Sequence, residues 1–255
     1  MHFATQIKYL PRLGEPHQLP LVLRQMFETL EEDGIDQVGI FRLASDEAAG
    51  SMKQLKRKHH VHRDRLSALR YDDDTMALAN LLVYTFASLP APLIPNADVN
   101  ACVKMGIPLQ RLKSSAVHAR YAVVQEKLDA MLVALPNTHH LVLMKLLGLL
   151  YRFSKNSAVN LMTAHNLAVA FAPVLWRAEA GSTSALAALL RLWIELGPQV
   201  LRKSKLLERP LKELVRQAAI EGVDMDALEG IQDTLIQSGE EVAKRELVKM
   251  VLALS

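Results

Sequence analysis

The apolar and polar residues of this chain alternate with the period of a helix. Pro20 suits the first turn of a helix, because the N–H that proline lacks has no partner there anyway. The following apolar residues keep the i, i+3, i+4, i+7 spacing of a buried helical stripe: Leu23, Met26, Phe27 and Leu30. Carboxylates fill the polar positions, and Gly34 follows them. The pattern therefore predicts a helix that ends at Gly34.

The same periodicity predicts further helices and no strand. We expect helices at residues 76–86, 121–135, 141–153, 162–172, 185–201, 211–220, 226–237 and 240–254. The helix at 141–153 is apolar almost all round, which indicates the buried centre of the fold. Two other helices should each bury one face. In the helix at 121–135 this face carries Val124, Leu128, Met131 and Leu132. In the helix at 185–201 it carries Leu186, Leu189, Leu190 and Trp193. Residues 96–117 read as a less regular connection, and the predicted fold class is an all-α helical bundle.

Prolines mark two helix ends in this reading. Leu89-Pro90-Ala91-Pro92 should close the helix at 76–86 with a rigid extended exit, and Pro173 should close the helix at 162–172. Residues 205–210 look like a joint before a short helical extension. The last helix carries an apolar stripe: Leu247, Val248, Val251, Leu252 and Leu254. That stripe packs on the main domain, packs within its own small bundle, or docks another protein as a helix in a groove.

Residues 33–45 separate two helical patterns and carry the candidate chemistry. Gly34 and Gly39 let the backbone bend there, and Ile40 and Phe41 should anchor the turn in the core. Arg42 follows them directly. A planar, permanently charged fork held in a fixed direction suits the charge on a phosphate. An arginine that pairs with a carboxylate or caps a helix is the alternative. We expect Arg42 to be exposed at its tip while Ile40 and Phe41 are buried.

A basic stretch follows from residue 53 to residue 70. A helix should begin after Ser45, a plausible N-cap, and it becomes basic at Lys53, Lys56, Arg57 and Lys58. These cations either complement the C-terminal dipole of a solvated helix or form a surface for an acidic partner or an anionic membrane. Histidines 59, 60 and 62 lack cysteine or carboxylate co-ligands for zinc. No aromatic residues interleave with the basic ones, so we expect no nucleic acid.

Composition narrows the remaining possibilities. Half of the 255 residues are hydrophobic, which suffices for a large core. The net charge of +3 is too small to indicate nucleic-acid binding. One cysteine, Cys102, excludes a disulfide framework and favours a reducing compartment, so we expect a cytoplasmic protein. No N-terminal signal is visible, and Lys145 interrupts the longest apolar run. The acidic residues 72–74 cap the next helix, with a magnesium site as the alternative.

The chain has no complete catalytic constellation of its own. A Gly-rich loop ending in Gly-Lys-Ser/Thr is missing, as are Gly-x-Ser-x-Gly and His-Glu-x-x-His. Cys102 has no activating neighbour in the sequence. An arginine that acts on another protein's substrate fits these absences. We therefore expect a regulator and not an enzyme, with no cofactor and no metal.

Three blocks resemble one family. Gly39-Ile40-Phe41-Arg42 resembles the arginine-finger loop of the Rho-family GTPase-activating domain, the RhoGAP domain. The segment at 89–94 is similar to its Leu-Pro-x-Pro-Leu motif, and residues 160–173 are similar to its Asn-Lys-Met-Thr…Asn-Leu-Ala…Phe-Gly-Pro signature. The blocks follow the family's order over about residues 3–203, which implies a RhoGAP-like domain at 1–203 and an extension at 204–255. The implied partner is a Rho-family small GTPase in its GTP form.

The resemblance assigns roles to matching residues. Arg42 matches the finger, and Asn166 matches the asparagine that supports the finger loop and the GTPase contact. Gly39 and Phe41 match structural positions of the loop, and Pro92 matches the second proline of Leu-Pro-x-Pro.

Several positions depart from the family pattern. Val83 and Ala87 stand where the family carries a lysine and, one helical turn later, an arginine that anchor the GTPase. Leu161 replaces the lysine of Asn-Lys-Met-Thr, Ala172 the glycine before Pro173, and Val174 the asparagine after it. The basic helix with Lys53 and Lys56 would be a compensating partner surface. A catalytically weak module that captures a GTPase or scaffold is therefore the alternative function.

Overall fold

The computed structural model describes an all-helical protein. The described residues are 19, 21–42, 75–94, 99–110, 124, 128, 131, 135, 137–177, 179–198, 202, 211–238 and 240–253. None of them lies in a strand, which confirms the predicted fold class. The chain divides into two compact units, Met1–Gly197 and Pro198–Ser255, and each is described by itself.

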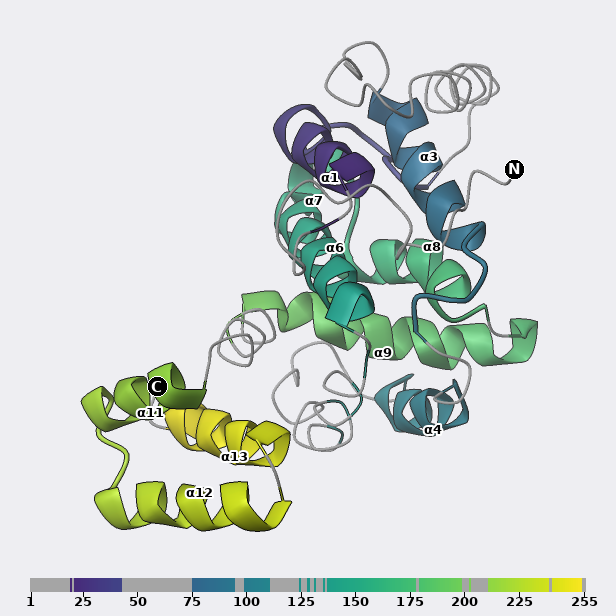
Figure 1. Ribbon diagram of the computed structural model, residues 1–255. Coiled ribbons are helices and arrows are strands. Elements are labelled where there is room, and N and C mark those ends of the chain that lie inside the picture. Colours follow the sequence, from purple (N-terminus) through teal and green to yellow (C-terminus); the bar gives the residue numbers. More distant parts are fainter. Residues whose placement is uncertain are drawn as a thin grey trace. The chain divides into compact units, whose positions relative to one another are not determined.

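The first unit is a bundle of helices around α9 (Figure 1). In that view α9 lies between α4 on one side and α6 and α8 on the other, and it packs against all three. The helices are α1 (Leu21–Asp33), α3 (Thr75–Ala87), α4 (Val99–Gln110), α6 (Asn137–Lys155), α7 (Ser157–Asn160), α8 (Ala164–Trp176) and α9 (Thr183–Glu195), with a 3-10 turn at Ala180–Ser182.

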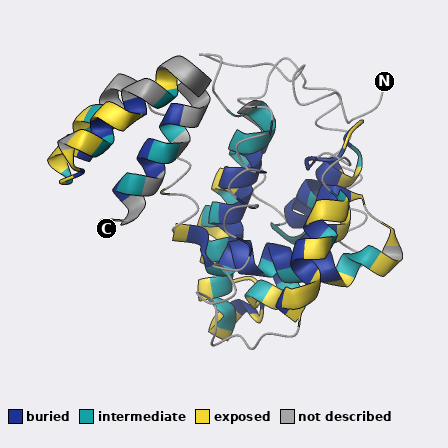
Figure 2. Ribbon diagram, turned by 90° about the horizontal axis from the view of Figure 1, so that it is seen from below, coloured by how far each residue is buried: buried dark blue, intermediate teal, exposed yellow. Residues whose placement is uncertain are grey.

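The predicted buried stripes are found in the structure. All four stripe residues of α1 are buried, and the inward face predicted for the helix at 185–201 is fully buried in α9. Helix α6 contributes much of the core, as its all-round apolar sequence predicted, while its Lys145 is exposed to solvent. Figure 2 shows these buried positions running along the inner sides of the helices.

Two indole rings stack at the junction of α8 and α9. Trp176 and Trp193 are both fully buried, with ring centroids 5.8 Å apart and ring planes 15° from parallel. Offset stacking of this kind adds to the hydrophobic stabilisation from burial, by about 0.5–1.5 kcal/mol. The pair therefore fixes the packing of the two helices.

Residues 99–110 correct the expectation of an irregular connection at 96–117. They form α4, whose buried residues include Cys102, Met105 and Leu109. Gly106 and Pro108 made this stretch read as non-helical. Gly106 is required by packing, because a Cβ atom there would lie 2.0 Å from the carbonyl oxygen of Ala185 on α9. Pro108 is exposed, so the carbonyl that loses its helical partner can bond to water.

Helices α8 and α9 also end elsewhere than predicted. Pro173 lies inside α8, which continues to Trp176 and ends where Arg177 adopts a left-handed conformation with φ 49°. The proline is exposed, and the burial of Leu175 and Trp176 offsets the lost backbone hydrogen bond. Helix α9 ends at Glu195 and not at residue 201. Leu196 forms a turn after it, and Gly197 and Pro198 are helical again.

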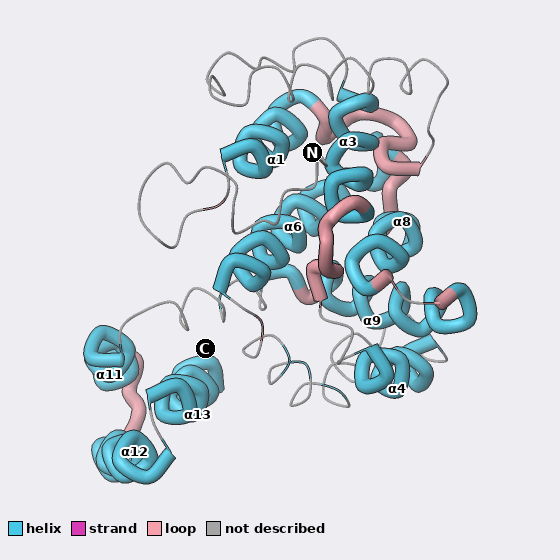
Figure 3. Tube along the Cα trace, turned by 45° about the vertical axis from the view of Figure 1, so that its right-hand side comes forward, coloured by secondary structure: helices cyan, strands magenta, loops and turns pink. Residues whose placement is uncertain are grey.

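The second unit is a bundle of three helices with its own core. It contains α11 (Leu211–Ile220), α12 (Met225–Ser238) and α13 (Glu240–Ala253), which lie side by side in Figure 3. Leu247, Val248 and Val251 of the predicted stripe are fully buried, together with Leu214 and Ala218. Of the alternatives for this stripe, the small bundle is the one that the structure shows.

Several predictions fall outside the described residues. These are the helix that begins after Ser45, the basic stretch with Lys53 and Lys56, the acidic residues 72–74 and most of the helix at 121–135. Within the last of these, Val124, Leu128 and Met131 are helical and buried, as predicted.

Candidate functional site

Residues 34–42, called here the Arg42 loop, leave the end of α1 in a series of tight turns. Backbone N–H groups donate to carbonyl oxygens within the loop, from Gln37 to Gly34 at 3.0 Å and from Arg42 to Gly39 at 2.9 Å. Gly39 has φ +72°, a conformation that side chains resist. Gly34 is needed for a different reason: a Cβ atom there would lie 2.9 Å from the backbone carbonyl oxygen of Leu30 and 3.1 Å from Cδ1 of Ile40. The two glycines thus allow a loop that folds back on itself.

Ile40 and Phe41 fasten the loop to the core. Ile40 is fully buried and Phe41 is 6% exposed. The Phe41 ring packs edge-on against Phe153 of α6 and Phe171 of α8, with centroids 5.3 and 5.1 Å apart. Phe41 has φ 66°, which costs a non-glycine residue about 1–3 kcal/mol. The aromatic contacts and the burial offset that strain, so the backbone before Arg42 is firmly placed.

Arg42 itself is exposed. Among the described residues none receives a hydrogen bond or an ion pair from its guanidinium group. The predicted combination of an exposed Arg42 with buried Ile40 and Phe41 is therefore confirmed. A guanidinium group offers five donors in a fixed fork and matches phosphate oxygens in pairs.

Asn160, at the end of α7, holds the Arg42 loop from inside the protein. This residue is fully buried. Its amide nitrogen donates to the carbonyl oxygens of Ile35 at 2.8 Å and of Phe153 at 3.0 Å. Its amide oxygen accepts from the N–H of Met162 at 2.8 Å, and its backbone carbonyl accepts from the N–H of Gly39 at 2.9 Å. One side chain thus links the loop to α6 and to the turn before α8.

A second asparagine reinforces this link. The amide nitrogen of Asn156 donates to the carbonyl of Ile35 at 3.1 Å and to Oδ1 of Asp36 at 2.6 Å. Neither asparagine has a predicted role, although Asn160 opens the signature at 160–173. For Asn160, which stands between Val159 and Leu161, a polar residue among apolar neighbours is the available signal, because buried amides need partners. Those partners lie more than a hundred residues away in sequence, where no local pattern points to them.

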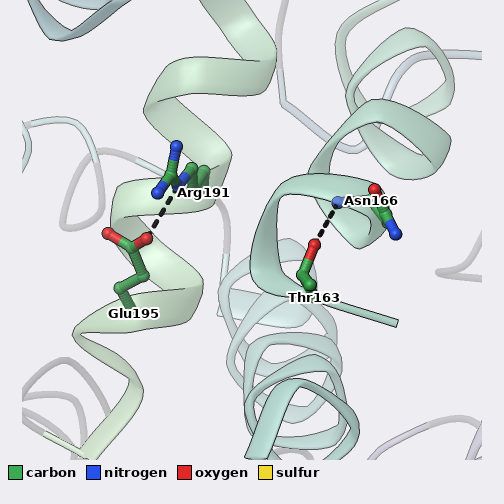
Figure 4. A network of polar contacts seen from close by, with 4 residues as sticks. All are labelled: Thr163, Asn166, Arg191 and Glu195. Carbon is green, nitrogen blue, oxygen red and sulfur yellow. Dashed lines mark hydrogen bonds and ion pairs between the residues drawn. The ribbon is translucent and has the colours of Figure 1, made fainter. Parts of the chain in front are cut away.

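Asn166, the asparagine to which the family resemblance assigns support of the loop, lies in the first turn of α8. Its backbone N–H donates to the side chain of Thr163, the N-cap, at 3.2 Å (Figure 4). Its amide nitrogen donates to the carbonyl of Leu161 at 3.1 Å. These bonds order residues 161–166, while the side-chain bonds described above that reach the Arg42 loop come from Asn156 and Asn160. Figure 4 also shows the ion pair of Arg191 with Glu195 along α9 at 2.7 Å, which stabilises that helix.

The Leu-Pro-x-Pro segment is held at both of its ends. The guanidinium group of Arg177 donates to the carbonyl of Leu89, and the N–H of Ile94 donates to the carbonyl of Leu175 at 3.1 Å. The carbonyl of Leu93 accepts from Nδ1 of His139 at 2.8 Å. Pro92 is buried, which favours a structural part over a direct partner contact.

Val83 and Ala87 lie on α3 as expected. Val83 is half-buried and Ala87 is exposed, and their neighbours Leu82 and Phe86 are fully buried. The helix therefore presents uncharged side chains at both positions. Lys53 and Lys56, the other predicted partner-binding residues, lie outside the described part of the chain.

Among the described residues, no three histidine, cysteine or acidic side chains gather in a way that could hold a metal ion. No helix in that part of the chain has the length and apolarity to cross a membrane.

Comparison with known proteins agrees with the helical fold described above. The family model described as the RhoGAP domain matches residues 20–180. The human breakpoint cluster region protein is 31% identical over 163 residues, and the rat Rho GTPase-activating protein 35 is 27% identical over 173 residues. These matches cover 64% and 67% of this chain but only 12% and 10% of those relatives, so the chain spans a small part of their length.

Solved structures share the fold. The human Rho GTPase activating protein 15 superposes with a TM-score of 0.59 at 22% identity, covering 71% of this chain and 83% of that one. The BH domain from GRAF, the GTPase regulator associated with focal adhesion kinase, gives 0.57 at 18% identity, covering 71% and 93%. Fold and site together define a helical domain with one exposed arginine on a loop that buried residues hold. With the family model matching well over half of its length, the chain belongs to the RhoGAP family.

Proposed function

We propose that this protein accelerates GTP hydrolysis by a Rho-family small GTPase and supplies Arg42 in trans. Membership in the RhoGAP family supports GTPase activation at the level of the family. The observation that carries the finer proposal is an exposed Arg42 on a loop held by buried residues on both sides.

The chemistry requires little else from this chain. Charge develops on the transferred phosphoryl group during hydrolysis, and an arginine from a partner stabilises that charge, which is worth about 10³–10⁵ in rate. The GTPase holds the nucleotide, so this protein regulates the reaction without binding a nucleotide of its own. Its preferred partner is the GTP form, because only that form carries the γ-phosphate. Rigidity of the Arg42 loop contributes because the backbone that carries the guanidinium group is then in place before the partner arrives.

A second candidate function is a binding module that captures a GTPase with little acceleration. Val83 and Ala87 favour it, because these two uncharged residues stand where the family resemblance implies charged anchors. Weakened docking would lower stimulation even with Arg42 in place.

Single-turnover GTP hydrolysis across a panel of Rho-family GTPases tests the proposal. We expect at least one GTPase to be stimulated, and Arg42→Ala to remove most of that stimulation while the fold remains intact, since an exposed side chain contributes little to the core. Arg24→Ala, which removes another exposed arginine from the same unit, is the matched control and should stimulate like the wild type. Binding of the GTP form without stimulation would favour the binding module. Full stimulation by Arg42→Ala would remove Arg42 from the mechanism.

A further inference from the structure

Helix α6 reaches solvent along one narrow face. Residues spaced alternately three and four positions apart lie on the same side of a helix. On α6 this face, called here the α6 stripe, consists of Thr138, Leu141, Lys145, Gly148, Arg152 and Lys155. Lys145, Arg152 and Lys155 are exposed, and the other three residues are half-buried. Every position of α6 that the structure describes as exposed therefore lies on this stripe.

The exposed positions of the α6 stripe are all positively charged. Helix α6 contains no aspartate or glutamate to balance them. Cations in the last turn of a helix complement its dipole, which accounts for Arg152 and Lys155. The dipole does not account for Lys145, which stands well before the last turn. The positive charge along the whole stripe therefore needs another explanation.

Little of this charge is balanced within the described part of the chain. Arg152 pairs with Glu31 of α1 at 2.9 Å, but the two side chains are 57% and 33% exposed. An ion pair as open as this contributes only about 0–1 kcal/mol. The Nζ atom of Lys155 lies 5.2 Å from the centre of the Tyr151 ring. No described residue accepts a hydrogen bond or an ion pair from Lys145. Two lysines are thus available to an anionic partner.

The geometry of the stripe favours a helix over a flat surface as that partner. Alternate spacing by three and four residues is the spacing along which a second helix packs lengthwise. Gly148 has no side chain to keep a partner's backbone away, and the half-buried Leu141 offers an apolar contact. A flat anionic membrane would also meet α1, where Glu28 is one turn from Glu31, the partner of Arg152. Those carboxylates would repel its phosphates.

We propose that the α6 stripe is a docking surface for an acidic amphipathic helix of a partner protein. Lys145 and Lys155 lie about 15 Å apart along the axis of α6, at 1.5 Å for each residue. Carboxylates about three turns apart on one face of the partner helix match this separation. Exposed charge pairs act mainly on the association rate, and salt weakens them. Docking of this kind does not involve Arg42, so it goes beyond the proposed function.

A synthetic peptide tests the proposal on the full chain. The probe is a fluorescein-labelled, alanine-rich helical peptide with glutamates about three turns apart on one face, and the same peptide with glutamines is the neutral control. Fluorescence anisotropy measures binding at low and high salt. We expect only the acidic peptide to bind, and Lys145→Glu with Lys155→Glu to weaken its binding about tenfold. The matched control is Lys53→Glu with Lys56→Glu, which changes the net charge equally on the basic stretch and should keep the affinity.

Three outcomes would overturn the proposal. The first is a wild type that does not bind the acidic peptide. The second is a loss of binding in the Lys53 and Lys56 variant as large as in the Lys145 and Lys155 variant, which would assign the peptide to the basic stretch. The third is binding to phosphatidylserine vesicles, absent with phosphatidylcholine alone, that the Lys145 and Lys155 variant loses while its peptide binding persists. Circular dichroism and urea unfolding should match the wild type in both variants, because exposed lysines contribute little to the core.

Discussion

The side chain of Asn160 uses its whole amide group. Both described donor contacts go to carbonyl oxygens, of Ile35 and Phe153, and the amide oxygen takes the N–H of Met162. In a fully buried position no water replaces a lost partner. The residue therefore joins the placement of Arg42 to the stability of the first unit.

Asn160→Ala should lower both stability and activity. The N–H of Met162 loses its partner in a buried place, at about 1–3 kcal/mol for a group left unsatisfied, and the carbonyls of Ile35 and Phe153 each keep only a bond from Asn156. We expect the free energy of unfolding, measured by urea denaturation, to fall by about 2–4 kcal/mol. The variant that remains folded should show a lower saturated rate of GTP hydrolysis, because the Arg42 loop is no longer held.

The matched control is Asn156→Ala. Asn156 is half-buried and shares the carbonyl of Ile35 with Asn160, so its loss should cost about 1 kcal/mol or less. Equal effects of the two substitutions would show that Asn160 has no special place in holding the loop.

Arg42 could be singled out from sequence because its neighbours specify its surroundings. Glycines, two apolar residues and an arginine in that order predict an anchored turn with a charged tip. The role of Asn160 could not be predicted from sequence. It depends on Ile35, which is brought to it only by the packing of α1 against α6. Leu161 was visible as a departure from the family, but its strained backbone and exposure became known only from the structure.

Helix α3 carries the second departure from the family. Val83 and Ala87 share a face of α3 beside its buried side, one helical turn apart. Replacing both should change recognition without unfolding the helix, since neither position is fully buried.

Val83→Lys with Ala87→Arg should speed association with a Rho-family GTPase and make it more salt-dependent. Exposed ion pairs contribute about 0.2–1 kcal/mol each and act mainly on the association rate. Stopped-flow binding at two salt concentrations measures this, with Ala101→Arg on α4 as a control charge elsewhere. No gain, together with strong wild-type stimulation, would mean that this chain docks its partner through another surface, with the basic stretch around Lys53 and Lys56 the first candidate.

The packing of α4 on α9 depends on the absence of one methyl group. At Gly106 a Cβ atom would meet backbone atoms of Ala185 at 2.0–3.0 Å, and backbone cannot move aside cheaply. Gly230 is an exposed position of helix α12, and nothing lies within 4 Å of a Cβ atom built there.

The same substitution should therefore have opposite effects on the two helices. Gly106→Ala should destabilise the first unit by about 1–3 kcal/mol through overpacking. Gly230→Ala should stabilise the second unit by about 1 kcal/mol, the difference in helix propensity between the two residues. Thermal and urea unfolding of both variants measures the two changes in the free energy of unfolding. A neutral Gly106→Ala would indicate that α4 can move away from α9 at little cost.

Sequence periodicity located the elements better than their ends. Helices α1, α3 and α6 follow from stripes or from runs of apolar residues. Helix α4 was missed because Gly106 and Pro108 are poor helix formers, and packing on α9 outweighs that preference. The proline predicted that α8 ends at Pro173. The helix instead continues to Trp176, whose burial stabilises the last turn.

The molecule as a whole consists of two units with separate cores. The first contains the candidate site, and the second buries the stripes of α11, α12 and α13 against one another. Two cores permit two unfolding transitions, so a single free energy of unfolding need not describe the chain.

The stacked pair of Trp176 and Trp193 makes the two units distinguishable by light. These are the chain's only tryptophans, and residues 198–255 contain no phenylalanine, tyrosine or tryptophan at all. Indole fluorescence and near-ultraviolet circular dichroism should therefore report the first unit alone, while far-ultraviolet circular dichroism reports the helices of both. We expect urea titrations followed by the two methods to give different midpoints, and Gly230→Ala to shift only the far-ultraviolet curve. Coincident curves in every variant would mean that the units unfold as one. Because the second unit lacks aromatic residues, energy transfer from tryptophan of this chain to an acceptor on a labelled GTPase would originate in the first unit alone.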